Sequence, residues 1–139
     1  MFDAARNNNG ALLLAAIDAG LPANLTNAQG NTLLMLAAYS GHVNLVEELI
    51  ARGGDVDALN DNLQSPIAGA VFKDYDDVVH VLAQAGADPR KGKPTAIETA
   101  YMFNRKQLLE TLGATSDDIS DNVPKPLSSY EAGSSGTEK

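Results

Sequence analysis

The chain has 139 residues, with 18 acidic and 10 basic side chains, which give a formal net charge of −8. This balance argues against sequence-independent nucleic-acid binding, because that function needs lysines and arginines clustered along one face. The chain contains no cysteine, which excludes disulfide bonds and thiolate metal sites. The first residues lack a signal-peptide pattern, and no run approaches the roughly 20 apolar residues of a bilayer span. We therefore expect a cytoplasmic protein, with the nucleus as a second location, that has neither a nucleic-acid nor a membrane partner.

The first clear helix signal covers residues 11–19, which are strong helix formers. The pattern stops at Gly20 with Pro22 just beyond, which is usual at a helix C-terminus. A second helix is predicted over 43–52, where apolar residues recur at i, i+1, i+4 and i+5 and so share one face. Leu49 lies on this face, and we expect it to be buried.

Three further helices are indicated by their first residues. Thr32, Ser65 and Thr95 are natural N-cap residues, and Pro66 follows Ser65 at the first helical position, where proline is favoured. No segment alternates with period two for long enough to suggest a strand. The predicted fold class is therefore all-α.

The chain also repeats itself at a spacing of 33 residues. The segment 32–38 is echoed by 65–71, and the same offset relates Gly20 to Gly53 and Gly53 to Gly86. A fixed period of this length indicates one supersecondary unit stacked on copies of itself, which is a short solenoid. Because a solenoid offers an extended face and no interior cleft, its default function is to hold another macromolecule.

The repeated unit resembles the ankyrin repeat, and the best match is Gly30-Asn31-Thr32-Leu33-Leu34-Met35-Leu36-Ala37-Ala38-Tyr39-Ser40-Gly41-His42 followed by Gly53-Gly54-Asp55. The resemblance implies an α-solenoid of about four repeats, each with two antiparallel helices and a β-turn finger. These repeats would cover about residues 1–26, 27–59, 60–90 and 91–114, with degenerate units at both ends.

The sequence departs from the family pattern in two ways. The Thr-Pro-Leu-His tetrapeptide is nowhere intact, and its histidine position holds Phe2, Met35, Ala68 and Glu98. That imidazole helps to tie neighbouring fingers together in the family, so other hydrogen bonds or packing must make the tie here. The last finger is three residues shorter, and we expect residues 90–94 to form a tight basic turn.

From Thr115 onward the chain has few core-forming residues, so it cannot offset its own ordering entropy. We expect a flexible tail over 115–139, whose first residues, through Ile119, can still cap the last helix pair. The tail is either a solvated end or a regulatory or partner-contacting segment. Thr115 and Ser128 each precede an acidic residue by three positions, which suits acidic-directed phosphorylation.

The resemblance implies a non-enzymatic module that binds a partner protein on its concave face. Family partners usually meet the two positions after the alanine pair and the finger tips. In this chain the former include Tyr39, Ser40, Phe72, Lys73, Met102 and Phe103, and the finger candidates include Gln29, Asn31, Asp61 and Gln64. Aromatic residues are enriched at interface hot spots, but rings here could equally pack between neighbouring inner helices. The sequence leaves both interpretations open.

Other functions receive less support from the residues. His42 and His80 occupy different places in the repeat and have no nucleophile at a matching spacing, and His42 fits a structural turn position. The stretch 55–66 resembles a calcium loop but lacks its glycine and closing glutamate. We expect a monomer with no catalytic residue, cofactor or metal. Aspartates in the central repeats raise one alternative, an escort for a basic client such as a nucleic-acid-binding or ribosomal protein.

Overall fold

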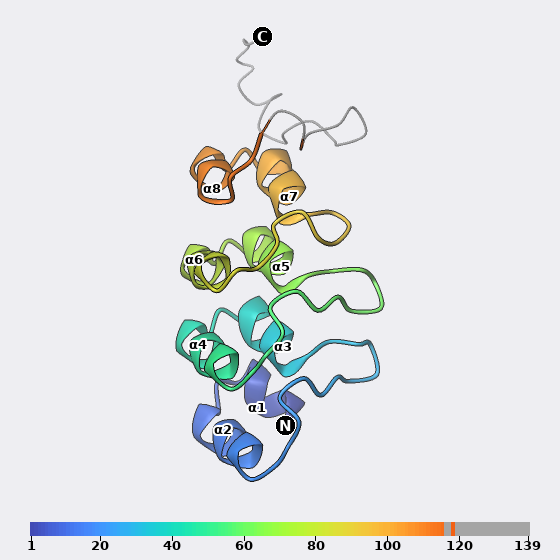
Figure 1. Cartoon of the computed structure of the whole chain (residues 1–139), viewed down its shortest axis with the longest axis vertical. Coiled ribbons are helices and arrows are strands. Elements are labelled where there is room, and N and C mark those ends of the chain that lie inside the picture. The colour runs from blue at the N-terminus through green and yellow to red at the C-terminus, as the bar shows by residue number, and fades with distance from the viewer. Residues whose placement is uncertain (116–117, 119–139) are drawn as a thin grey trace.

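The computed structural model describes residues 1–115 and 118, and within them it contains eight helices and no extended strand. The helices are α1 (Phe2–Arg6), α2 (Gly10–Asp18), α3 (Leu33–Tyr39), α4 (Val43–Ala51), α5 (Pro66–Lys73), α6 (Asp76–Gln84), α7 (Ala96–Met102) and α8 (Lys106–Thr111). They form four pairs stacked along one axis, with the odd-numbered inner helices in one row and the even-numbered outer helices in another (Figure 1). Long loops between pairs project to one side as fingers. The predicted all-α solenoid is confirmed.

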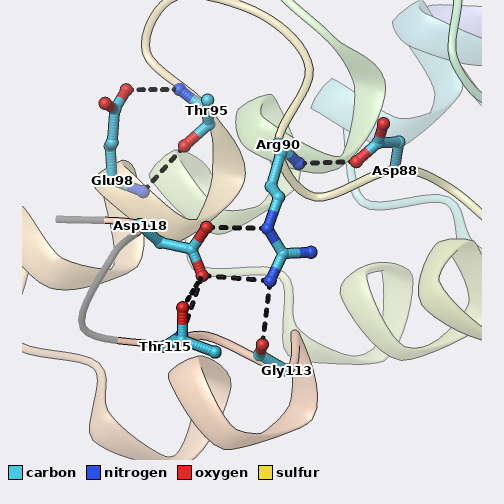
Figure 2. Close-up of polar contacts among 7 residues, drawn as sticks. All are labelled: Asp88, Arg90, Thr95, Glu98, Gly113, Thr115 and Asp118. Atoms are coloured by element: carbon cyan, nitrogen blue, oxygen red, sulfur yellow. Dashed lines mark hydrogen bonds and ion pairs between the residues drawn. The ribbon is translucent and has the colours of Figure 1, made fainter.

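The predicted N-caps are present at three of the four inner helices. The hydroxyl of Thr32 accepts a hydrogen bond from the Met35 amide, and that of Ser65 accepts one from the Ala68 amide, each at 3.1 Å. Thr95 forms a reciprocal capping box with Glu98 (Figure 2). Each cap satisfies an amide that has no partner within its helix and so fixes where the helix begins.

The core lies between the two rows of helices. The inner helices contribute small side chains to it, and those that are fully covered include Ala5, Ala37, Ala38, Ala70 and Ala100. Larger side chains from the outer helices fill the space behind them, including Leu13, Val46, Leu49, Val79 and Leu82. Leu49 is 1% exposed, so the predicted apolar face of α4 is confirmed.

The turn inside each helix pair has the same backbone conformation throughout the solenoid. Asn8, Gly41, Asp74 and Asn104 all have φ between 58° and 78°, in the left-handed region. The next residue is the N-cap of the outer helix in every pair.

Three of these N-cap residues reach back to the preceding pair. The Nε2 of His42 bonds the Arg6 carbonyl at 2.6 Å, so its predicted role as a structural turn residue is confirmed. The ring of Tyr75 covers Gly41, where a Cβ would lie 2.9 Å from a ring carbon. Arg105 pairs with both Asp74 and Asp76. These contacts link each pair to its neighbour at the turns.

The fingers are tied together by hydrogen bonds that need no imidazole. The Asp61 amide donates to the Gln29 carbonyl at 3.0 Å, and the Lys93 amide donates to the Leu63 carbonyl at 2.9 Å. The buried Asn60 adds a side-chain bond to Asn31 at 2.8 Å. Of the two replacements expected for the histidine tie, hydrogen bonds or packing, the hydrogen bonds are present.

A further tie joins each finger base to the loop that follows the next outer helix. In the first interval Asn24 makes it alone, because its side chain donates to the Gly53 carbonyl at 3.1 Å and accepts from the Asp55 amide at 2.7 Å. One period later, Asp57 accepts from the Asp88 amide at 2.7 Å.

At the last interval two residues share this task (Figure 2). Arg90 donates to the Gly113 carbonyl at 3.0 Å, and Asp118 accepts from the Thr115 amide at 2.7 Å. The guanidinium and the carboxylate also bond each other, with Nε to Oδ1 at 2.7 Å. The hydrogen bond from Arg90, assisted by the Thr115 amide, lowers the pKa of Asp118 to about 2. Asp118 thus caps the last helix pair, as expected, whereas the expectations for residues 116–117 and 119–139 lie outside the described residues.

Replacing Leu49 by alanine should lower the free energy of unfolding by about 2–5 kcal/mol, because a fully buried side chain leaves a cavity. Chemical denaturation measures this change. Leu12→Ala is the matched control, since Leu12 lies on α2 with half of its surface exposed. A loss at Leu49 below about 1 kcal/mol would show that the outer helix is not packed as described.

The Arg90–Asp118 contact should make stability depend on pH in acid. Because the folded-state pKa of Asp118 lies below its ordinary value of 3.8, the carboxylate stabilises the fold above about pH 4, and this stabilisation is lost as the pH falls toward about 2. Asp118→Asn should therefore melt below the wild type at pH 6, and the difference should shrink between about pH 4 and pH 2. Asp3→Asn, at the opposite end, is the control. A difference that stays constant down to pH 2 would contradict the assignment.

Candidate functional site

A groove of about 370 Å³ opens between inner helices α5 and α7. Its finger-side end is formed by Gln64 and Pro94, which precede the two helices. Its other end is formed by residues at the helix C-termini, namely Phe72, Lys73, Met102 and Phe103. Tyr39, Ala68, Gly69 and Thr99 complete the lining. The volume falls within the range of about 300–1,000 Å³ that is usual for ligand pockets.

An exposed aromatic pair stands at one end of the groove. The rings of Phe72 and Phe103 meet edge to face, with centroids 5.5 Å apart and planes at 68°. Phe72 is 62% exposed, more than any other large apolar side chain in the described part of the chain. Phe72 points away from the core because the preceding residue, Val71, lies on the buried face of α5. Aromatic side chains that remain in water in this way are typical of interaction surfaces.

Tyr39 contributes to the groove in a different way. Its ring lies against Gly69 of α5, where any Cβ would overlap the ring, and its hydroxyl donates to the Ser65 carbonyl at 3.1 Å. Burial raises the pKa of Tyr39 to about 12. Tyr39 therefore helps to hold α3 against α5. The sequence left two interpretations of the aromatic row open, packing or binding, and the ring of Tyr39 is a packing ring. Phe72 remains available at the surface.

The structure brings together six of the residues selected from the sequence: Tyr39, Gln64, Phe72, Lys73, Met102 and Phe103. It does not bring the other four to the groove. Ser40 is the C-cap of α3, and Gln29, Asn31 and Asp61 join the first two fingers through the bonds described above.

Sequence reasoning missed four lining residues, which are Ala68, Gly69, Pro94 and Thr99. Gly69 carried a usable signal, because a glycine inside a helix costs stability and often marks a close approach by another group. Here that group is the ring of Tyr39. The other three residues carry no signal of their own, since they line the groove only through the stacking of α5 and α7.

The described residues form no helix that is long and apolar enough to cross a membrane. The stacked helix pairs, the inward alanines and the fingers define a helical repeat protein with an open side groove. A family model described as ankyrin repeats, in three copies, matches residues 1–93, so the chain belongs to the ankyrin repeat family. Ankyrin repeats are generally protein–protein interaction modules, and their proteins are typically not enzymes.

Several curated proteins are similar to parts of the chain. Human ankyrin repeat domain-containing protein 29 is 43% identical over 56 residues, which is 40% of this chain and 19% of that protein. A putative ankyrin repeat-containing protein of Treponema pallidum is 39% identical over 74 residues, or 52% of this chain and 25% of that protein. A putative ankyrin repeat protein of Pseudomonas aeruginosa is 48% identical over 46 residues, which is 33% of this chain and 27% of that protein. The matches thus span about a quarter or less of these relatives' lengths.

Tyr39 should be needed for stability. Tyr39→Phe should lower the free energy of unfolding by about 0.5–1.5 kcal/mol through loss of one hydrogen bond, and Tyr39→Ala should cost more because it also empties the space over Gly69. Phe72→Ala, a matched loss of one exposed ring, should change stability little.

The pH dependence of stability in alkali gives a second test of the packing of Tyr39. Because the folded-state pKa of Tyr39 is raised above 10.0, the neutral phenol stabilises the fold below about pH 10, and this stabilisation is lost as the pH rises toward about 12. The stability of Tyr39→Phe should lack this loss between about pH 10 and about pH 12. Equal stability of wild type and Tyr39→Ala in denaturant would contradict the packing role.

Proposed function

We propose that this chain is a non-enzymatic protein-binding module that holds a segment of a partner protein on its concave face, centred on the groove between α5 and α7. The observation that carries the proposal is the exposure of Phe72, 62% in water yet fixed edge to face against Phe103. A preordered aromatic pair can bury large apolar area on binding at little cost in side-chain entropy.

The rest of the concave face supports the groove. Residues 1–114 would act as one binding unit, in which Tyr39 and the finger hydrogen bonds fix the spacing of the inner helices. Ser40 and the finger residues Gln29, Asn31 and Asp61 would then form a polar rim and not the centre of the interface. A polar rim around an apolar centre is the usual anatomy of a protein interface.

The acidic side chains that suggested a basic client are largely engaged within the solenoid. Asp74 and Asp76 pair with Arg105, and Asp57 accepts a hydrogen bond from the Asp88 amide. Because Arg105 offsets one of the two charges of Asp74 and Asp76, and Asp57 is directed at a backbone amide, these carboxylates offer a basic client less than their number suggests. The proposal is therefore limited to a groove-binding module.

The test is quantitative affinity capture with the full chain as bait. Phe72→Ala should weaken partner binding by about 1–3 kcal/mol, which is roughly five- to 150-fold, because it removes the aromatic anchor. Its matched control is Leu12→Ala, which removes an exposed apolar side chain from outer helix α2 and should keep wild-type binding.

Circular dichroism must show that both variants melt like the wild type, so that a lost partner reports on the surface and not on folding. The proposal fails if folded Phe72→Ala retains the same partners at the same strength as the wild type. It also fails if Leu12→Ala loses them equally.

A further inference from the structure

From the groove's lining and the charges beside it, we infer that its occupant is an extended segment of a partner protein in which a bulky apolar side chain is flanked by carboxylates. This inference rests on the proposed function and deepens it by assigning the chemistry of the partner. It runs against the chain's own charge of −8, which by itself would favour a basic partner.

The walls of the groove call for an apolar side chain. Phe72, Phe103, Met102 and Pro94 present rings, a thioether and a pyrrolidine to the same space of about 370 Å³. A polar group entering there would lose water without gaining enough partners, whereas an aliphatic or aromatic side chain would gain contact on several sides. Methionine can adjust its shape to the side chain that enters.

The cations beside the groove are without ionic partners in the described part of the chain. Lys73 lines the groove, and Lys93 directly precedes Pro94 at its finger-side end. Every ion pair among the described residues is made by an arginine, and neither lysine takes part in one. Both lysines are exposed to solvent. A carboxylate on a bound segment would therefore meet an available ammonium group at either end.

The nearby carboxylates, by contrast, already have hydrogen-bond or ion-pair partners. Glu98 accepts the Thr95 amide in the capping box at the start of α7. Asp74 and Asp76, just beyond the C-terminus of α5, are held by Arg105. None of these carboxylates lines the groove, and among the described residues Lys73 is the one charged side chain in its lining.

Screening makes this local charge decisive. At physiological salt the Debye length is about 8 Å, so aspartates elsewhere on the solenoid act weakly on a segment in the groove. Lys73 lines the groove, so it lies within that distance of a bound segment and acts on it more strongly. An acidic flank is therefore favoured at the groove even though the whole molecule is acidic.

The experiment selects peptides from a random 12-residue phage-displayed library on the immobilised full-length chain. We expect the enriched peptides to share an aromatic or aliphatic residue with Asp or Glu within a few positions. Resynthesised peptides should bind Lys73→Glu about tenfold or more weakly than the wild type, and Phe72→Ala similarly. Lys106→Glu is the matched control, because it makes the same charge reversal at an exposed site on outer helix α8 and should leave binding unchanged.

The affinity of an altered peptide and the salt dependence of that affinity separate this inference from the proposed function. Replacing the peptide's Asp and Glu by Asn and Gln should weaken binding and flatten its salt dependence. If enriched peptides depend on Phe72 but are basic or uncharged and bind Lys73→Glu equally well, the inference is overturned and the proposed function stands. If no enriched peptide depends on Phe72, both are overturned.

Other occupants of the groove would also overturn the inference. A dimer in sedimentation velocity that Phe72→Ala dissociates would assign the groove to a second copy of the chain. Peptide binding that tightens more than tenfold when Val123, Leu127 and Tyr130 are replaced by serine in the full-length chain would assign it to the chain's own C-terminal segment.

Discussion

The close stacking of the inner helices depends on small buried residues. Ala37 and Ala38 of α3, Ala70 of α5 and Ala100 of α7 are fully buried, and a methyl side chain leaves room for neighbouring helices to approach closely. This approach sets the spacing of the whole solenoid. The finger hydrogen bonds, the reach of His42 to the Arg6 carbonyl and the contact of Tyr39 with Gly69 all require that spacing. A larger side chain at these positions would push successive pairs apart and break several ties together.

The contact that an inner helix makes with the next one differs between two intervals of the concave face. Between α3 and α5 the ring of Tyr39 fills the space over Gly69. Between α5 and α7 the equivalent space stays open, with Phe72 and Phe103 at its end. One period-locked row of side chains therefore performs two tasks, packing at one interval and presenting a surface at the next. The difference arises from what each ring meets on the neighbouring helix.

The last interval shows how a repeat array can close with residues outside the repeat pattern. Asn24 bridges the first interval alone, whereas Arg90 and Asp118 together supply the donor and the acceptor at the last one. The polar requirement is the same, because the carbonyl and amide in the loop after an outer helix need partners at both places. Asp118, although distant in the repeat pattern, completes the fourth helix pair.

The sequence by itself determined the local structure and the repeat. The hydroxyl caps at Thr32, Ser65 and Thr95 and the apolar face of 43–52 depend on residues close together in the chain. The spacing of 33 residues is visible by comparing one segment of the sequence with the next. All of these features could therefore be interpreted without a fold. The residues at one end of the groove, including Phe72 and Phe103, were candidates because of the resemblance to the ankyrin repeat. Only the tertiary structure decided that Tyr39 packs, that Pro94 and Thr99 join the lining, and that Lys73 and Lys93 carry unpaired charge among the described residues. These outcomes depend on which side chain of a neighbouring pair lies opposite, and a one-dimensional pattern does not contain that information.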